Sequence, residues 1–352
     1  MKFRLTKNMK IAVACRGGPE NGPFSAKAVQ ILAKGLARQN LNISAIYAVS
    51  GSTPTALLGC IGEYDQLCDI WLSLTPNQIV GKFSKLRGSA NLIRGSSILS
   101  SKSLEEVLRA STNLDEIFNA PMNIYIGAVD LLIPSPIIVF TNRNSTHRDN
   151  LINGVMGSMA VAPYFPPIFI DNPYKYGLVD DPERKELFLI DGAYKKNIML
   201  EHAVKAGYDV VFMVDIHGLK TSPADLDSPF RWPYILTKAT HILMESNDNG
   251  QWDSVRRVNE EITVRDELKS AIMNLPPQDR ALFDSVMSRM NIGDLRLINK
   301  KRVETFLISK PDSSRLFNFA SFKKAEVPFL LEAGRLAAID TLKKVNINTH
   351  GL

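Results

Sequence analysis

The chain has 352 residues, of which 45% are hydrophobic and 22% charged, a composition typical of a soluble globular protein with a sizeable core. The net charge of +6 favours an anionic partner such as a membrane surface, but the basic residues form only short scattered pairs, so we expect no nucleic acid partner. Three cysteines exclude a disulfide framework, and their spacing predicts no metal site; we expect no cofactor.

Targeting segments are not expected. The apolar run Ile11–Cys15 is shorter than the roughly seven residues that a secretory signal needs, and no stretch approaches the roughly eighteen of a membrane span. The sequence therefore predicts a cytoplasmic or peripheral membrane protein without signal peptide or transmembrane segment.

The first elements form a βαβ pattern. An apolar strand over residues 10–15 precedes the glycine loop 16–22, and apolar residues at helical spacing follow over residues 26–36. A second strand covers residues 40–49. Strand, loop, helix and strand in this order predict a sheet that is at least partly parallel.

The second strand runs into a turn that carries hydroxyl side chains. Pro54 opens a helical pattern that continues to about Cys68. A strand that turns sharply into a helix is the layout of a nucleophile elbow, whose pattern is Gly-x-Ser-x-Gly. Matched from Gly51 through Ser52, this pattern places Thr53 at the nucleophile position.

Two other interpretations of the turn stay open. Thr53 followed by proline is also an ordinary helix N-cap. The elbow can alternatively be shifted, with Ser50 or Ser52 as the nucleophile; Ser50 lies between the small residues of Ala48-Val49-Ser50-Gly51-Ser52.

The middle of the chain contains a capping box over residues 103–106, which predicts a helix that starts at Ser103. Residues 122–129 and 137–141 are expected strands. The expected helix over residues 150–161 is rich in small residues, which indicates that another backbone packs close by; these are Gly154, Gly157, Ser158 and Ala160.

The later elements complete the domain. A strand over residues 186–190 ends in Asp191-Gly192-Ala193, and a helix (199–206) and a strong strand (209–216) follow. We expect one α/β domain over residues 1–352, with a core at about 9–220, a mainly helical excursion at 221–302, and a closing strand and helix at 303–352.

Acyl transfer requires a nucleophile, a base and donors for the oxyanion. Thr53 is the candidate nucleophile, and Asp191, just past a strand end, is the candidate base. The loop residues Gly17 and Gly18 are candidate oxyanion donors. None of the five histidines directly ends a strand as Asp191 does. His217 comes closest to this setting, because it follows the expected strand 209–216. The pattern therefore favours a two-residue dyad without histidine.

The order of these pieces resembles that of patatin-like phospholipases. The glycine loop, the elbow, the small-residue helix running into Pro163-Tyr164-Phe165-Pro166-Pro167, and Asp191-Gly192-Ala193 occur in that family's order. The resemblance implies a three-layer α/β fold with a mostly parallel central sheet and helices on both faces. It also implies a Ser–Asp dyad, a glycine-loop oxyanion hole, and hydrolysis of acyl esters in a phospholipid or other lipid at a membrane surface.

The sequence departs from the family pattern in the pieces that carry chemistry. Thr53 and Thr55 replace a serine and a glycine of the elbow, and the loop has Pro19 and Asn21 where the family has a glycine and a basic residue. Proline has no N–H to donate. A catalytically inactive patatin-fold protein that binds lipid or protein is therefore the alternative. A nucleotide-binding protein that uses its glycine turns is a third hypothesis.

Overall fold

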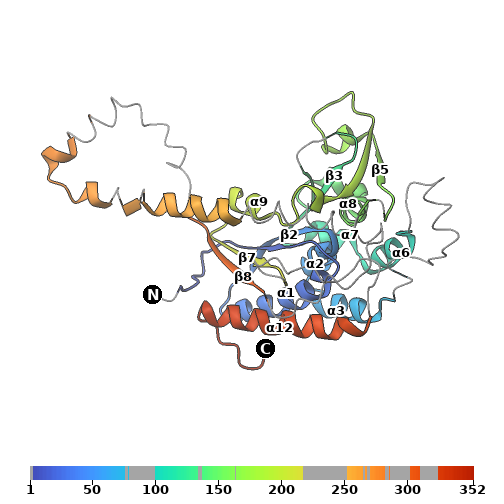
Figure 1. The fold of residues 1–352 in the computed structure, drawn as a ribbon, viewed down its shortest axis with the longest axis horizontal. Helices are drawn as coiled ribbons and strands as arrows, with labels where there is room; N and C mark the ends of the chain where they lie inside the picture. Colours follow the sequence, from blue (N-terminus) through green and yellow to red (C-terminus); the bar gives the residue numbers. More distant parts are fainter. Residues whose placement is uncertain are drawn as a thin grey trace, which may run out of the picture.

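The fold is organised around one central sheet, seen here in a computed structural model of the chain (Figure 1). The structure describes residues 3–75, 78, 100–133, 137–162, 164–216, 252–264, 266–267, 270–281, 285, 302–309 and 324–352. Within them the sheet has eight strands in the order β5-β6-β3-β2-β1-β7-β8, with β4 also paired to β3. The strands are β1 (Ile11–Cys15), β2 (Ile43–Val49), β3 (Asn123–Asp130), β4 (Ile138–Thr141), β5 (Ile168–Asp171), β6 (Glu186–Asp191), β7 (Val210–Val214) and β8 (Glu304–Ile308).

Strand direction confirms the predicted mostly parallel α/β sheet. β3, β2, β1, β7 and β8 are all parallel to one another. β4 and β6 run antiparallel to β3, and β5 runs antiparallel to β6. The carboxyl ends of β1, β2, β3 and β7 therefore share one edge of the sheet, which is where parallel α/β proteins bind ligands.

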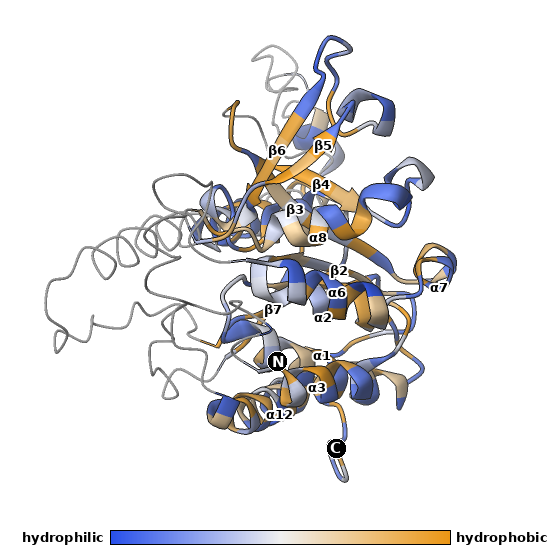
Figure 2. Cartoon of the chain, turned by 90° about the vertical axis from the view of Figure 1, so that its right-hand side faces the viewer, coloured by the Kyte–Doolittle hydropathy of each residue, from blue (hydrophilic) through white to orange (hydrophobic). Residues whose placement is uncertain are grey.

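Helices cover both faces of the sheet, as the sequence predicts. The long helices α1 and α12 pack together on one face, and α9 lies on the other (Figure 1). The α-helices with assigned bounds are α1 (Asn21–Ala37), α2 (Thr53–Gly59), α3 (Tyr64–Ser73), α6 (Lys102–Ser111), α7 (Leu114–Asn119), α8 (Leu151–Ser158), α9 (Leu200–Lys205) and α12 (Val327–Lys344). Figure 2 shows that strands β4 to β6 are largely hydrophobic and that the loop at the far end of β5 and β6 is hydrophilic.

Several boundaries differ from the sequence prediction. The helix expected up to Cys68 is two helices, because the chain turns at Gly62 with a φ of +82°, a value that glycine adopts without strain. α6 begins at Lys102, after Ser101, so the predicted start at Ser103 is wrong by one residue. Strand β5 was not predicted, because its four residues are too short for a period-2 pattern to stand out.

The predicted helical excursion is described only in part. Residues 252–264 are helical, and Val255 and Ile262 bury their side chains. Residues 217–251 and 286–301 lie outside the described residues. Of the helices that the structure describes, none has the length and apolar character that crossing a membrane requires.

Candidate active site

The turn after β2 is a strained elbow centred on Ser50. Val49 is extended, with φ −137° and ψ 145°, and Ser50 then takes a φ of +54°. A non-glycine residue in this left-handed region costs on the order of 1–3 kcal/mol and persists only where its surroundings enforce it. Thr53 is already helical, with φ −61°. The sharp turn therefore occurs at Ser50, three residues before the position that the family pattern indicated.

Ser50 and Asp191 form a buried hydrogen-bonded pair. The Ser50 hydroxyl donates to Asp191 Oδ2 over 2.6 Å, although 141 positions separate the residues. Ser50 is 3% exposed and Asp191 is fully buried. The pair forms because β2 and β6 both flank β3, whose Gly127 is level with Val49 and whose Ala128 is level with Asp191.

The expectation that Thr53 faces Asp191 is wrong. Thr53 is the first residue of α2, and its hydroxyl donates to the Ser50 carbonyl over 2.8 Å. The Thr53 backbone N–H is directed to the same carbonyl. The hydroxyl of Thr53 thus holds the first turn of the helix, and the hydrogen bond to the carboxylate comes from Ser50.

Gly51 and Ser52 follow Ser50 in the elbow, whereas the sequence pattern placed them before the nucleophile. A Cβ on Gly51 would lie 2.4 Å from the carbonyl oxygen of Gly18, so only glycine fits there. Ser52 Oγ lies 2.8 Å from the Val49 carbonyl and 3.2 Å from the Cys15 carbonyl, and ties the elbow to the ends of β2 and β1. Ser52 does not contact the carboxylate through any hydrogen bond recorded among the described residues.

Burial raises the pKa of Asp191 to about 7. Two hydrogen bonds oppose this rise by stabilising the carboxylate: the one from the Ser50 hydroxyl, and the one from the Ala193 backbone N–H to Oδ1 over 2.8 Å. A carboxyl group with a pKa near neutrality exchanges protons at the pH where a general base is most effective.

The glycine loop lies directly against Ser50. A Cβ on Gly17 would be 2.9 Å from Ser50 Cβ and 2.4 Å from Asn197 Oδ1. The Gly17 N–H, however, donates to the Asn197 carbonyl over 2.8 Å, so it is not free to hold an oxyanion as expected. Gly18 has a φ of +118°, and its N–H has no recorded hydrogen bond to another described residue.

Asn21 anchors this loop, a role that the sequence did not reveal. Its side-chain amide donates to the Gly17 carbonyl over 2.9 Å and accepts from the Ile216 backbone N–H over 3.0 Å. Asn21 therefore ties the loop to the end of β7. Beside it, Arg16 and Asp215 form a buried ion pair of 2.9 Å.

A signal for Ser50 does exist in the sequence. The elbow pattern uses small residues on both sides of the nucleophile so that strand and helix can approach each other. Ala48 and Ser52 occupy the two flanking positions around Ser50, so a pattern defined by residue size, not by glycine itself, would have placed the nucleophile at Ser50.

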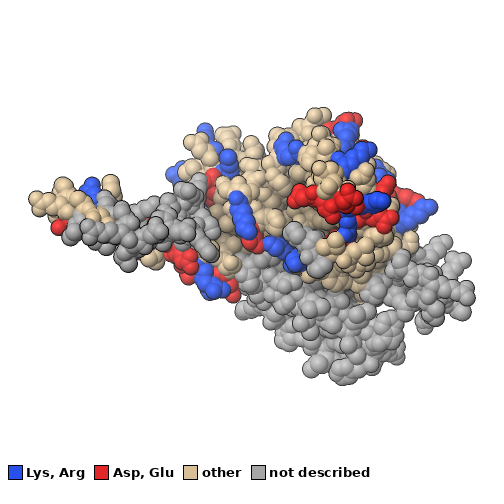
Figure 3. Space-filling view, turned by 90° about the horizontal axis from the view of Figure 1, so that it is seen from above, with Lys and Arg blue, Asp and Glu red and all other residues tan. Residues whose placement is uncertain are grey.

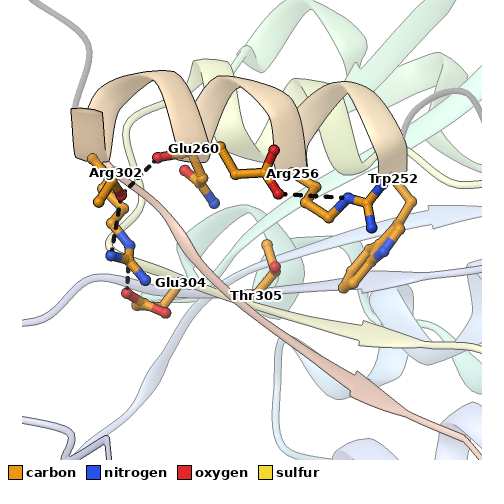
Figure 4. Close-up of a pocket in the computed structure, with 8 residues that line it drawn as sticks. Trp252, Arg256, Glu260, Arg302, Glu304 and Thr305 are labelled. Carbon is orange, nitrogen blue, oxygen red and sulfur yellow. Dashed lines mark hydrogen bonds and ion pairs between the residues drawn. The ribbon is translucent and has the colours of Figure 1, made fainter. Parts of the chain in front are cut away.

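A separate cavity of about 230 Å³ lies between the helix at residues 252–264 and the start of β8 (Figure 4). Arg302 faces Glu304 over 2.9 Å, and Arg256 faces Glu260 over 3.9 Å. Each arginine is thus paired with a glutamate, so the charges that line the cavity are of both signs and favour neither an anionic nor a cationic ligand. Glu304 begins β8, so the cavity lies toward the amino end of the parallel strands, opposite the edge that carries Ser50. Its lining includes Trp252, Arg256, Glu260, Arg302, Glu304 and Thr305.

Comparison with known proteins gives a weak structural similarity. No family model matches the sequence, and no curated protein matches it. Among solved structures, the chain is similar to VipD from Legionella pneumophila, with 11% sequence identity and a TM-score of 0.36 over 97% of this chain and 70% of that one. A similarity this distant carries no argument about function. The features that define the site are therefore those of the chain itself: a mostly parallel α/β fold with a buried serine–aspartate pair at a strained elbow.

Proposed function

We propose that this chain is a patatin-like lipid acyl hydrolase that uses Ser50 as nucleophile and Asp191 as base. The observation that carries this proposal is the 2.6 Å hydrogen bond between them at a positive-φ elbow. A nucleophile hydrogen-bonded to a base, on a strand-to-helix turn, is the geometry that acyl transfer needs.

In the first half of the reaction, Ser50 Oγ attacks the ester carbonyl carbon while its proton moves to Asp191 Oδ2. The carbonyl oxygen becomes an oxyanion, for which the candidate donor in the loop is the Gly18 N–H, because the Gly17 N–H is engaged with Asn197. As the tetrahedral intermediate collapses, the bond from carbon to the alkoxy oxygen breaks, and Asp191 returns the proton to the departing alcohol. The product that stays behind is an acyl ester of Ser50.

In the second half, water attacks the acyl-Ser50 carbonyl and gives its proton to Asp191. Collapse of this second intermediate breaks the bond to Ser50 Oγ, which takes the proton back, and the carboxylic acid leaves. One aspartate therefore serves as base and then as acid in each half.

A lipid ester as substrate is supported by the motif order and by an exposed apolar turn. Leu131, Leu132 and Ile133 are 46–59% exposed directly after β3, at the same sheet edge as Ser50. Exposed clusters of large apolar side chains are typical of surfaces that contact a membrane or another protein. On the face in Figure 3, acidic and basic side chains lie beside one another. The attraction to an anionic membrane is therefore argued from the net charge of +6.

The alternative, an inactive patatin-fold protein that binds lipid or protein, is favoured by the loop. The Gly17 N–H is engaged with Asn197, and Pro19 has no N–H, so the loop offers fewer donors than the family pattern. The loss of one oxyanion donor typically lowers the rate by about 10²–10³. A slow enzyme and an inactive one must therefore be separated by a test of the serine itself.

The test is reaction with a fluorophosphonate probe, followed by peptide mapping, alongside hydrolysis of a chromogenic short-chain ester. We expect the wild type to carry the probe on Ser50 and to hydrolyse the ester. Ser50→Ala and Asp191→Ala should abolish both, whereas Thr53→Ala should keep the label.

Thr53→Ala is the matched control, because Thr53 is a buried hydroxyl residue in the same turn. Absence of probe from Ser50 in folded wild-type protein would refute the hydrolase and favour the inactive protein. Loss of labelling in Thr53→Ala, with Ser50→Ala still labelled, would return the nucleophile to Thr53.

A further inference from the structure

The small residues of α8 bring that helix unusually close to the sheet. A Cβ on Gly154 would lie 2.4 Å from Phe140 Cγ, and one on Gly157 would lie 2.5 Å from Leu189 Cβ. Because neither position tolerates a side chain, the carboxyl end of α8 reaches the backbone of the elbow. The next residue along the helix is Ser158, which is fully buried.

The Ser158 hydroxyl makes two hydrogen bonds to backbone groups of the site. It accepts from the Ser50 backbone N–H over 2.9 Å and donates to the Gly127 carbonyl over 2.5 Å. A serine hydroxyl has a single proton to donate, and here that proton is directed at β3, which leaves a lone pair for Ser50. The hydroxyl therefore bridges the strained elbow to the strand that separates β2 from β6.

Ala160, two residues after Ser158, contacts Asp191, the other member of the Ser50–Asp191 pair. The Asp191 backbone N–H donates to the Ala160 carbonyl over 3.0 Å. The segment Ser158–Ala160 thus contacts the backbone of Ser50 and the backbone of Asp191 at once.

We propose that Ser158 is a positioning residue that sets the separation of Ser50 Oγ and Asp191 Oδ2; this rests on the proposed acyl transfer. Without the hydroxyl, the Ser50 N–H and the Gly127 carbonyl both lose a partner, and the left-handed conformation of Ser50 loses a bond that holds it. A misplacement of about 1 Å lowers a rate on the order of 10²-fold. Ser158 acts through the backbone of Ser50 and does not itself contact the reacting atoms.

The first test compares Ser158→Ala, Ser158→Thr and the control Ser25→Ala by ester kinetics. Ser25 is also fully buried, and its hydroxyl bonds to the Gly22 carbonyl and to Thr55. We expect Ser158→Ala to lower kcat by about ten- to a hundred-fold with little change in KM. Ser158→Thr, which keeps the hydroxyl, should recover most of kcat, and Ser25→Ala should keep the wild-type value per folded molecule.

The pH dependence supplies a readout that a merely structural role would not change. The hydrogen bond from Ser50 lowers the pKa of Asp191, so displacement of Ser50 should move the midpoint of the rate profile of Ser158→Ala to higher pH. An unchanged midpoint together with an unchanged kcat would overturn the proposal.

Amide hydrogen exchange keeps the inference testable apart from activity. The Ser50 N–H loses its acceptor in Ser158→Ala and should exchange faster than in wild type and in Ser25→Ala. If the wild type shows no probe labelling but the Ser50 N–H still exchanges faster in Ser158→Ala, the positioning role of Ser158 is supported while the hydrolase is refuted. If the exchange rate of the Ser50 N–H is unchanged in Ser158→Ala, the positioning role of Ser158 is refuted even if the enzyme is active.

Discussion

Arg16 and Asp215 form an ion pair of 2.9 Å at the carboxyl ends of β1 and β7, with both side chains less than 10% exposed. Arg16 is the first residue of the glycine loop, and its backbone N–H donates to the Val214 carbonyl over 3.0 Å. The pair therefore joins the base of the loop to the neighbouring strand, next to the Ser50–Asp191 site.

Removal of one partner of this pair should be strongly destabilising. Asp215→Ala breaks a buried ion pair by removing its carboxylate, which typically costs about 3–5 kcal/mol in the free energy of unfolding. Urea unfolding of wild type and variant measures this difference. The control Glu105→Ala breaks an exposed helical pair with Arg109 and should cost less than about 1 kcal/mol. Equal effects in the two variants would contradict the structural role of the buried pair.

The sheet could be predicted from the sequence, because its strands are short apolar runs bounded by glycine, proline and polar residues. Ile11–Cys15 and Val210–Val214 are fully buried, and this is what an uninterrupted apolar run predicts for a central parallel strand. Asp191 could be selected for a similar local reason, since it stands at a strand end before Gly192-Ala193.

The register of the elbow could not be predicted from the local sequence, because it depends on contacts between distant parts of the chain. Ser50 keeps its positive φ because Ser158, 108 positions away, accepts a hydrogen bond from the Ser50 N–H. The absence of a side chain on Gly17 also leaves space for the Ser50 Cβ. Neither contact is visible in the local pattern, which instead matched Gly51 to the first glycine of the motif and so displaced the nucleophile to Thr53.

Asp191 should make stability depend on pH. Its folded pKa, about 7, lies above the ordinary value of 3.8, so the folded state binds the proton more tightly than the unfolded state. The stabilising contribution is thus fully present below about pH 4 and is lost as pH rises through about 7, by up to about 1.4 kcal/mol per pH unit. The difference in unfolding free energy between wild type and Asp191→Asn, measured from pH 4 to 9, should follow this curve. A difference that is constant over that range would show that Asp191 titrates normally.

The same ionisation should govern activity. The base must be deprotonated to accept the Ser50 proton, so the rate of ester hydrolysis should fall about ten-fold per pH unit below the apparent pKa near 7 and level off above it. Probe labelling of Ser50 should follow the same profile. A rate that stays constant from pH 5 to 9 would exclude Asp191 as the base.

Thr53 should contribute to stability more than to chemistry. Thr53→Val keeps the shape of the side chain but removes the hydroxyl that donates to the Ser50 carbonyl, so we expect a loss of about 1 kcal/mol in unfolding free energy. The fluorophosphonate label should remain on Ser50. Thermal denaturation and peptide mapping measure the two effects, and a variant that is stable but unlabelled would reverse this assignment.

Gly51 offers the sharpest test of the packing between the elbow and the glycine loop. The Cβ of Gly51→Ala would lie 2.4 Å from the Gly18 carbonyl oxygen and 3.2 Å from Pro19 Cα, both backbone atoms that cannot rotate away. Loop and elbow must therefore separate, which should cost about 1–3 kcal/mol of stability. The separation also moves Gly18 away from Ser50, so probe labelling should slow well beyond what the loss of folded protein explains. Gly35→Ala is the matched control, since its new Cβ meets only the movable end of the Leu342 side chain. Gly35→Ala should lose stability without loss of labelling per folded molecule. If both variants lose labelling equally, the packing of the loop against the elbow has no specific effect on the reactivity of Ser50.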